Sequence, residues 1–378
     1  MKSTDKIPEI LLVTRPLTPP WDEASKNFAY LLAKRLVGFK FHILVGEKDS
    51  HLPQNVTQHL IYRGADWNIM QKTKLVLKLF LLLKRNPQIN IVHFIFVPTP
   101  FNTKILKSLT ASPSVKTIQT IACVSGKNKG GIKTLLFADR FITYSKYTTA
   151  NFSGEDRKKT LTISPFIDFK KFTPVGKNKR GKLRMEYRFR PGDKIILYPG
   201  EYSRLNALDL LWQGFCSIRS KIPNAKLLMA CRLKSREDQK IERAFQEKIA
   251  KSKFADSVKF LGRVENIKEL YQLSNLTVFP VKSIEGKFDL PFVLLESLAC
   301  GTPILTSDIG ALPEIWQDNP EYLEKYVFPS KDPSLFVKKS VSILNQKEPA
   351  DLKLAAYIKN RFNQEKILKK YAQIYSTL

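Results

Sequence analysis

The chain has 378 residues, of which 43% are hydrophobic, a length and composition that predict two folded domains and exclude wholesale disorder. It carries 63 Lys and Arg against 34 Asp and Glu, a formal net charge of +29. Such a charge favours a polyanionic partner, whether nucleic acid, an anionic membrane face or a phosphorylated ligand, unless the lysines are merely solvated.

Strands and helices alternate through the first part of the chain. The first strand is predicted at Glu9–Thr14, and a proline-rich turn separates it from a helix over about Asp22–Val37. Further strands are predicted at Phe41–Val45, Ile91–Phe96, Thr117–Ala122 and Phe141–Tyr144. This alternation predicts a parallel sheet with right-handed crossovers.

A second helix, predicted over Lys72–Lys84, has two interpretations. Its lysines, Lys72, Lys74, Lys78 and Lys84, surround the apolar residues Leu75, Val76, Leu79, Phe80, Leu82 and Leu83. A basic rim around an apolar body suits an anionic lipid surface. The alternative is that the apolar face simply packs on the first sheet.

The alternation lapses between about Asp168 and Lys194. Phe169–Lys194 contains ten Lys or Arg against two acidic residues, so we interpret it as an exposed linker. Beyond it, strands are predicted at Ile195–Tyr198, Lys226–Ala230, Val258–Leu261, Leu276–Pro280 and Pro303–Thr306. Helices are predicted at Ala207–Ser220, Glu237–Ala250, Ile267–Leu273, Pro291–Ala299 and Glu365–Ser376.

Two successive doubly wound α/β units are the simplest account of this order. We place the first domain at residues 1–168, the basic linker at 169–194 and the second domain at 195–360. A helix at 361–378 then packs back on the first domain. Ligands of such units bind at the carboxyl ends of the strands, so we expect a cleft between the two domains.

The four cysteines are scattered and form no CxxC pair: Cys123, Cys216, Cys231 and Cys300. We therefore expect a reducing compartment, with no metal site and no disulfide framework. Met1–Glu9 is polar and lacks the apolar core of a signal peptide, and the longest apolar run, Leu75–Leu83, is too short to span a bilayer. We expect a cytoplasmic protein, soluble or peripheral on the inner face of a membrane.

The segment Lys287–Ile304 combines a polar loop, a helix and a glycine-terminated return to a strand. Pro291 suits the first helical turn, and Gly301 suits the residue just past the helix end. Amides at the helix start make an anion site. Glu296 lies over a turn into the helix, where a solvated carboxylate can accept two hydrogen bonds from a vicinal diol such as a ribose.

These residues resemble the retaining glycosyltransferases of family 4, among the glycosyl transferases group 1. LLESLACGTP at Leu294–Pro303 resembles the second half of that family's motif, and GALPE at Gly310–Glu314 resembles the element that follows it. The resemblance extends along the whole chain through Phe137–Ser145, Pro165–Phe172, Phe260–Gly262 and Val278–Pro280.

The resemblance implies the GT-B architecture, in which two Rossmann-like domains with parallel sheets face each other across a cleft. It implies a hexosyltransferase-class enzyme that moves a sugar from a nucleotide-sugar donor to a lipid-linked or glycan acceptor with retention of anomeric configuration. The leaving diphosphate accepts the acceptor's proton, so no protein nucleophile, metal or bound cofactor is required. The protein positions the substrates and stabilises charge.

We take seven residues as candidates for that site. We assign three to catalysis: Asp289 on the donor sugar, Arg204 on the leaving phosphate, and His93. We assign four to donor binding: Glu296, Lys282, Phe292 and Gly200. Each has a structural alternative: Asp289 as a helix cap, His93 as a structural residue, Arg204 and Lys282 as surface charges, and Glu296 as a partly buried carboxylate paired with a lysine.

The sequence also departs from the family pattern. The position eight residues before Glu296 holds Phe288 instead of Glu, which leaves Asp289 and Glu285 as the nearby acids. After Gly200 the family's Arg is replaced by Glu201, and its Lys-Gly by Asn206-Ala207. Gln119 stands where a histidine often lines the sugar site.

These departures favour a rival interpretation, a catalytically degenerate GT-B fold that acts as a nucleotide- or glycan-binding module. A nucleic-acid binder is a weaker rival, because the chain shows no RNP, zinc-finger or helix-turn-helix pattern. A dehydrogenase is disfavoured because GxGxxG is absent after the first strand. A phosphorylase is disfavoured because the chain is short and has no pyridoxal-binding lysine motif.

Overall fold

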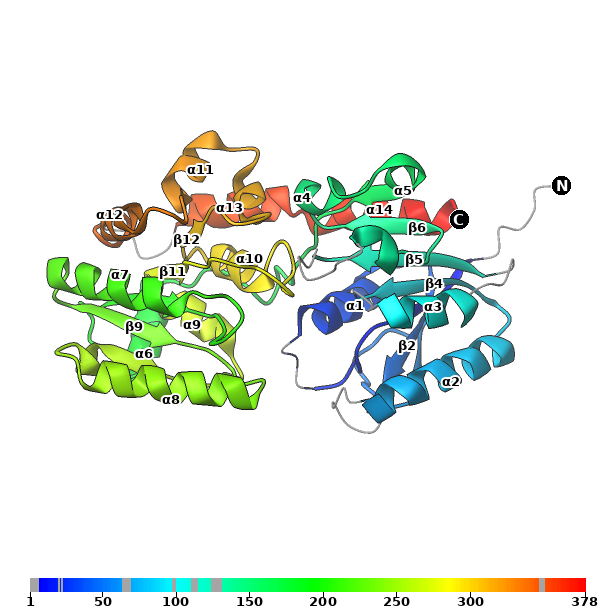
Figure 1. Cartoon of the computed structure of the whole chain (residues 1–378), viewed down its shortest axis with the longest axis horizontal. Coiled ribbons are helices and arrows are strands. Elements are labelled where there is room, and N and C mark those ends of the chain that lie inside the picture. Colours follow the sequence, from blue (N-terminus) through cyan, green and yellow to red (C-terminus); the bar gives the residue numbers. More distant parts are fainter. Residues whose placement is uncertain are drawn as a thin grey trace. The chain divides into compact units, whose positions relative to one another are not determined.

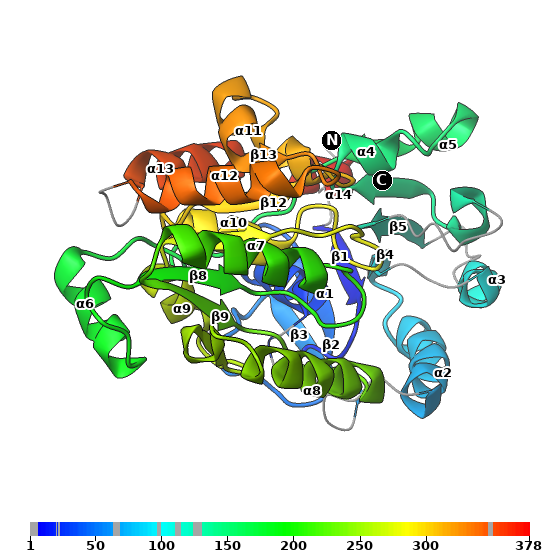
Figure 2. The ribbon, with the colours of Figure 1, turned by 60° about the vertical axis from the view of Figure 1, so that its left-hand side comes forward.

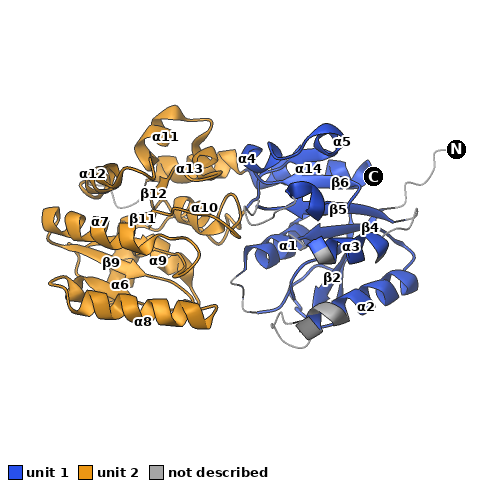
Figure 3. Cartoon of the chain, in the orientation of Figure 1, with its two compact units in different colours: residues 1–166, 363–378 blue, residues 167–362 orange. Residues whose placement is uncertain are grey.

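The computed structural model describes residues 7–19, 21, 23–62, 69–96, 100–109, 115–123, 131–346 and 351–378. The chain forms two compact units (Figure 3). Unit 1 comprises Met1–Phe166 and Asn363–Leu378, and unit 2 comprises Ile167–Phe362. The C-terminal helix therefore belongs to the same unit as the first strand.

Within the described residues, unit 1 contains a seven-stranded parallel sheet with the order β3-β2-β1-β4-β5-β6-β7 (Figure 1). Its strands are β1 (Glu9–Val13), β2 (Lys40–Val45), β3 (Val56–Leu60), β4 (Ile89–Ile95), β5 (Lys116–Ile121), β6 (Arg140–Thr143) and β7 (Thr160–Thr162). The sequence predicted five of these but not β3 or β7. Both lie at an edge of the sheet, and their sequences, VTQHL and TLT, lack a run of apolar residues.

Helices cover both faces of this sheet (Figures 1 and 2). The helices of unit 1 are α1 (Ala24–Arg35), α2 (Ile69–Arg85), α3 (Pro100–Leu109), α4 (Lys146–Thr149), α5 (Gly154–Lys158), α14 (Gln364–Ser376) and the 3-10 turn η1 (Ile132–Leu135). Val92 and Phe94 of β4 pack with buried residues of α2 and α3. His93, between them, points to the opposite face, where Tyr371 and Tyr375 of α14 lie.

The predicted helix over Lys72–Lys84 corresponds to α2, and its apolar residues divide between two faces. Leu75, Leu79 and Leu82 are buried in the core under the sheet, as the packing alternative expects. Phe80 is 53% exposed, so it takes no part in that core. The side chains of Lys72 and Lys74 lie outside the described residues.

Unit 2 contains, within the described residues, a six-stranded parallel sheet with the order β10-β9-β8-β11-β12-β13. Its strands are β8 (Lys194–Tyr198), β9 (Ala225–Met229), β10 (Val258–Phe260), β11 (Leu276–Phe279), β12 (Ile304–Ser307) and β13 (Val327–Phe328). Its helices are α6 (Lys177–Glu186), α7 (Leu208–Lys221), α8 (Arg236–Ala250), α9 (Ile267–Leu273), α10 (Phe292–Ala299), α11 (Pro320–Tyr326), α12 (Pro333–Leu344) and α13 (Leu352–Arg361), with 3-10 turns η2 (Ala255–Ser257) and η3 (Leu312–Trp316). Two parallel-sheet α/β units thus confirm the predicted fold class.

The prediction of an exposed linker over Phe169–Lys194 is wrong. This stretch lies in unit 2 and contains α6, whose Arg180 and Arg184 are buried. Arg184 donates to the carbonyl of Leu273 at 3.0 Å, and Arg180 donates to the carbonyl of Ser274. These carbonyls lie at the C-terminal end of α9, where the helix dipole favours a positive charge. The two arginines therefore hold α6 against α9 and are not solvated linker residues.

Candidate functional site

Three loops of unit 2 begin where β8, β9 and β11 end. Because β8 pairs with β9 on one side and β11 on the other, these loops meet where the strand order reverses, the usual ligand site of a doubly wound sheet. Glu201 and Arg204 lie in the loop after β8, Lys234 in the loop after β9, and Lys287 in the loop after β11.

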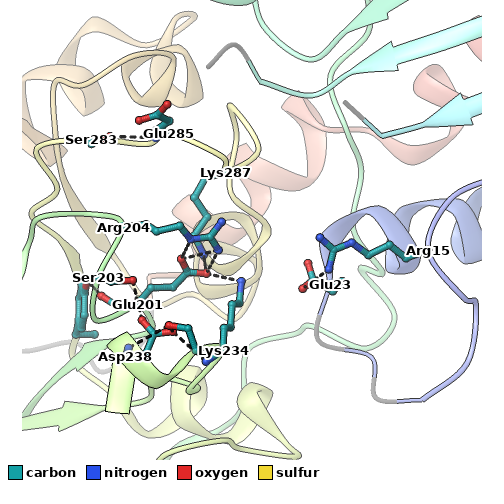
Figure 4. Close-up of polar contacts among 12 residues, drawn as sticks. Arg15, Glu23, Glu201, Ser203, Arg204, Lys234, Asp238, Ser283, Glu285 and Lys287 are labelled. Carbon is teal, nitrogen blue, oxygen red and sulfur yellow. Dashed lines mark hydrogen bonds and ion pairs between the residues drawn. The ribbon is translucent and has the colours of Figure 1, made fainter. Parts of the chain in front are cut away.

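Glu201 binds all three cations (Figure 4). Its Oε1 lies 2.6 Å from Nζ of Lys234 and 2.8 Å from Nζ of Lys287. Nε and Nη2 of Arg204 donate to its two carboxylate oxygens, each at 2.9 Å, in a bidentate pair. We call these four residues the Glu201 cluster. With three cations and one carboxylate, its formal charge is +2.

Exposure differs sharply across the Glu201 cluster. The side chain of Glu201 is 4% exposed, whereas that of Arg204 is 44% exposed. Burial alone would raise the pKa of Glu201, but the charges of Lys287 and Lys234 and their hydrogen bonds outweigh burial and lower this pKa to about 2. Glu201 is therefore a permanent carboxylate that holds the cations in place, while Arg204 keeps a face toward solvent.

Asp238 fixes the two loops that carry Arg204 and Lys234. Its Oδ1 accepts from the hydroxyl of Ser203 at 2.7 Å, and its Oδ2 accepts from the amide of Lys234 at 3.0 Å. The hydroxyl of Ser235 also donates to Oδ2, at 3.0 Å, and caps α8 by accepting from the amide of Asp238. The cations of the cluster thus project from loops that are anchored by hydrogen bonds.

Gly200, assigned to donor binding, has a packing role. A Cβ atom at this position would lie 2.0 Å from the ring of Tyr198, closer than any real contact. The Tyr198 hydroxyl donates to the carbonyl of Glu201 at 3.1 Å, so the ring folds under the turn. A residue without a side chain is needed for β8 to turn into the loop that carries Glu201.

Helix α10 follows the sequence prediction closely. It begins at Phe292, after Pro291, and ends at Ala299. Gly301 has a φ of +76°, the left-handed conformation expected just past a helix end. The amides of Leu294 and Leu295 donate to the carbonyl of Pro291, so the amides that lack an acceptor within α10 are those of Phe292 and Val293.

Glu296 differs from the solvated carboxylate that we expected. It is 8% exposed, and its Oε2 accepts a hydrogen bond from the hydroxyl of Tyr271 at 3.2 Å. Burial raises the pKa of Glu296 to about 7, although the Tyr271 hydrogen bond and the charge of Lys171 act in the opposite direction. This carboxyl therefore changes its charge near neutral pH.

Three other assigned residues lie where direct contact with a donor is not supported. The side chain of Asp289 is fully buried, and the cap of α10 is Pro291 and not Asp289. The contact of Asp289 with the donor sugar stays a prediction. Phe292 is 6% exposed and packs edge-to-face on Phe288 with ring centroids 5.7 Å apart. Lys282 is exposed and forms no part of the Glu201 cluster.

His93 lies in the core of unit 1, and its assignment to catalysis stays a prediction. His93 is fully buried inside unit 1, and both of its ring nitrogens have partners. Nδ1 lies 2.7 Å from the hydroxyl of Tyr375, and Nε2 lies 2.7 Å from the hydroxyl of Thr120. Burial lowers the pKa of His93 to about 3, so the imidazole is neutral. It joins β4 and β5 to α14.

Sequence reasoning missed Lys234 and Lys287. Lys287 lies inside the motif segment, whereas Lys282, just before it, is the lysine that we assign to donor binding from the sequence. One signal was present: Glu201 replaces a cation of the family pattern. An acid that becomes buried requires nearby positive charge, so its presence indicated compensating lysines.

No group of three or more His, Cys, Asp or Glu that could hold a metal ion occurs in the described part of the chain. The expectation of a metal-free, cofactor-free reaction stays a prediction. Likewise, none of the helices in the described ranges is long and apolar enough to cross a membrane.

Comparisons with known proteins bear on this site. Residues 179–361 match the model of the family Glycosyl transferases group 1. N-acetyl-alpha-D-glucosaminyl L-malate synthase of Bacillus anthracis is 24% identical over 221 residues, which cover 58% of this chain and 54% of that protein. D-inositol 3-phosphate glycosyltransferase of Geodermatophilus obscurus is 27% identical over 164 residues, or 42% of this chain and 35% of that one. The chain thus spans about half or less of the length of these curated relatives.

Solved structures are similar over nearly the whole chain. A glycosyltransferase from Rickettsia africae has a TM-score of 0.75 at 16% identity, with 98% of each chain covered. Anabaena Alr3699/HepE, in complex with UDP and glucose, has a TM-score of 0.75 at 14% identity, with 98% of this chain and 100% of that chain covered. The chain therefore has the GT-B fold, and its residues 179–361 match the glycosyl transferases group 1.

Proposed function

We propose that the protein is a glycosyltransferase that takes a sugar from a nucleotide-sugar donor and transfers it to a lipid-linked or glycan acceptor. The observation that carries the proposal is the Glu201 cluster: three cations converge at the carboxyl edge of the unit 2 sheet, where the strand order reverses. Their excess positive charge suits the diphosphate of such a donor.

In this proposal Arg204 and Lys287 bind the diphosphate and stabilise the charge that develops on it as the glycosidic bond breaks. Arg204 is the half-exposed member of the cluster, so it can reach a ligand without leaving Glu201. The N-terminal end of α10 carries partial positive charge on its first amides, which attracts an anion. Glu296 lies four residues into that helix. In its ionised form, its carboxylate accepts hydrogen bonds from the ribose diol of the nucleotide.

The acceptor attacks the anomeric carbon of the donor sugar, the bond to the diphosphate breaks, and the acceptor proton passes to the leaving diphosphate. Configuration is retained and no protein nucleophile is required. This scheme needs no histidine base, which agrees with the burial of His93 in the core of unit 1. The protein's contribution is to hold the diphosphate among fixed charges.

The comparisons support this direction. The family model covers the part of the chain that holds the Glu201 cluster and Glu296. Among proteins of similar fold, Alr3699/HepE was crystallised with UDP-glucose, and the catalytic domain of starch synthase IV from Arabidopsis thaliana was crystallised with ADP. We therefore propose a nucleoside diphosphate as the donor's leaving group, with the base and sugar to be identified by screening.

A second candidate is a nucleotide-binding module without turnover. Glu201 favours this second candidate, because its buried carboxylate neutralises one of the positive charges that would otherwise bind a diphosphate. In this reading the protein binds nucleoside diphosphates but releases none from nucleotide-sugars.

One experiment separates the two candidates. The protein is incubated with UDP-, GDP- and ADP-sugars, and release of nucleoside diphosphate is measured beside its binding by thermal shift. We expect release with at least one donor and a loss of about a hundredfold in kcat/KM for Lys287→Met. Lys240→Met, an exposed lysine on α8 with no assigned role in the site, is the control and should keep its activity. Binding without release supports the module, and no binding at all overturns both.

A further inference from the structure

Helix α2 of unit 1 presents large apolar side chains to solvent. Leu77, Phe80 and Leu81 are 63%, 53% and 46% exposed. Their spacing places them on one face of the helix. The opposite face, with Leu75 and Leu79, is buried against the sheet. We call Leu77, Phe80 and Leu81 the α2 outer face. Among the described residues of unit 1, packing leaves this face exposed, so its apolar character needs another explanation.

Basic residues surround the α2 outer face. Lys84 and Arg85 are exposed at the end of the same helix, and Lys78, also exposed, donates to the carbonyl of Ile61 at 3.2 Å. Acidic residues are absent from the whole stretch 67–138, which contains eleven Lys or Arg. Two of these, Lys104 and Lys107, are exposed on α3, which lies beside α2 (Figures 1 and 2). Any partner of this surface must therefore be apolar at its contact with α2 and anionic around it.

A bilayer with anionic headgroups has both properties. An amphipathic helix with leucine and phenylalanine on one side and lysines at the border lies in the interface between headgroups and acyl chains. Nucleic acid fits less well, because phosphate contacts do not use exposed leucines and base stacking requires aromatic rings, of which this face has only Phe80. We propose that the α2 outer face docks on an anionic membrane surface.

In the docked state Leu77, Phe80 and Leu81 enter the interfacial layer, and Lys84 and Arg85 lie at the headgroup phosphates. Lysine and arginine stems are long enough to remain in the headgroup layer while the helix axis lies parallel to the surface. The contact is peripheral. Its affinity depends on both apolar insertion and electrostatic attraction, since a few apolar side chains or a few charges alone give weak, reversible binding.

The test is sedimentation of the whole protein with vesicles of phosphatidylcholine, or of phosphatidylcholine with phosphatidylglycerol. We expect binding to the mixed vesicles that weakens with salt, and little binding to the neutral ones. The double variant Phe80→Gln, Leu81→Gln should reduce the partition coefficient at least tenfold, and so should Lys84→Gln, Arg85→Gln. The control is Met185→Gln, Leu352→Gln, which removes two apolar side chains of unit 2 that are 64% and 67% exposed. It should bind as the wild type does.

A second readout tests insertion directly. In Phe80→Trp, lipids brominated near the headgroup end of their chains should quench additional fluorescence beyond that of the wild type. Because all substituted side chains are exposed, the melting temperatures should stay unchanged. Equal binding to both vesicle types, binding to neither, or wild-type binding by the Phe80→Gln, Leu81→Gln variant would overturn the proposal. The assay uses no sugar donor, so its outcome is independent of the proposed transferase activity.

Discussion

The ammonium group of Lys287 lies 2.8 Å from Oε1 of Glu201, a contact that joins the loop after β11 to the loop after β8. Lys234 reaches the same oxygen from the loop after β9. A single buried carboxylate thus holds loops from three neighbouring strands together and positions the cations that we propose for phosphate binding.

Glu201→Gln should destabilise unit 2. The native pKa of Glu201 is lowered to about 2 from an ordinary value of 4.5, so its stabilising effect is present above pH 4.5 and is lost as the pH falls toward 2. The variant should lose about 3 kcal/mol at pH 7 and show a weaker further loss between pH 4.5 and 3 than the wild type. Hydrogen exchange of unit 2 peptides measures this. Glu237→Gln, an exposed carboxylate on α8, is the control. Equal stability of Glu201→Gln and wild type at pH 7 would contradict the assignment.

Arg204→Ala should lower turnover more than donor affinity. The guanidinium stabilises charge that appears on the diphosphate only as the bond breaks, so kcat should fall by about a hundredfold while KM changes by a small factor. Steady-state kinetics with the donor identified by screening gives both constants. Arg236→Ala, an exposed arginine at the start of α8, should leave both unchanged. A rise in KM at constant kcat would show that Arg204 only binds the ground state.

Glu296→Gln should alter the pH dependence of stability. The native pKa of Glu296 is raised to about 7, so its contribution is fully present below about pH 4.5 and is lost as the pH rises through 7. The wild type should therefore lose up to about 3 kcal/mol between pH 5 and 8 from this group, and the variant should not. Denaturant unfolding at both pH values tests this. Parallel pH profiles for the two proteins would show that Glu296 is already ionised at pH 5.

The same variant tests ribose recognition. Glu296→Gln should weaken binding of the nucleoside diphosphate about ten- to a hundredfold at pH 8, where the wild-type carboxyl is ionised, and by less at pH 6. Tyr271→Phe, which removes the hydrogen bond to Oε2, should raise the carboxyl pKa and shift the wild-type binding profile to higher pH. Titration calorimetry measures these affinities. Normal nucleotide binding by Glu296→Gln at pH 8 would make Glu296 a structural residue.

His93→Leu should reduce stability without a specific effect on catalysis. The substitution leaves the buried hydroxyls of Tyr375 and Thr120 without their imidazole partner, at a cost of about 2 to 4 kcal/mol. Well below the lowered melting temperature, kcat/KM should remain within a few-fold of the wild-type value. His51→Ala, whose side chain is 83% exposed, should change neither quantity. A stable His93→Leu protein without turnover would restore a catalytic role.

The sequence by itself determined the order of most strands and helices, the parallel α/β class and the limits of α10. These properties follow from local patterns: apolar runs for buried strands, a 3.6-residue period for helices, and Pro291 and Gly301 at the ends of α10. Short edge strands such as β3 were not predicted. An edge strand has only one neighbouring strand and is partly exposed to solvent, so few of its residues need to be apolar.

Only the tertiary structure decided which polar residues meet and which are buried. Lys287, and not Lys282, reaches Glu201 because the path of the loop after β11 selects the inward lysine. His93 occupies the core because a helix from the far end of the chain covers its face of the sheet. On α2 nearly every side is apolar, so the sequence could not show that Leu79 packs inside and Leu77 faces solvent. Such choices depend on contacts between segments distant in the sequence, which periodicity within one segment does not encode.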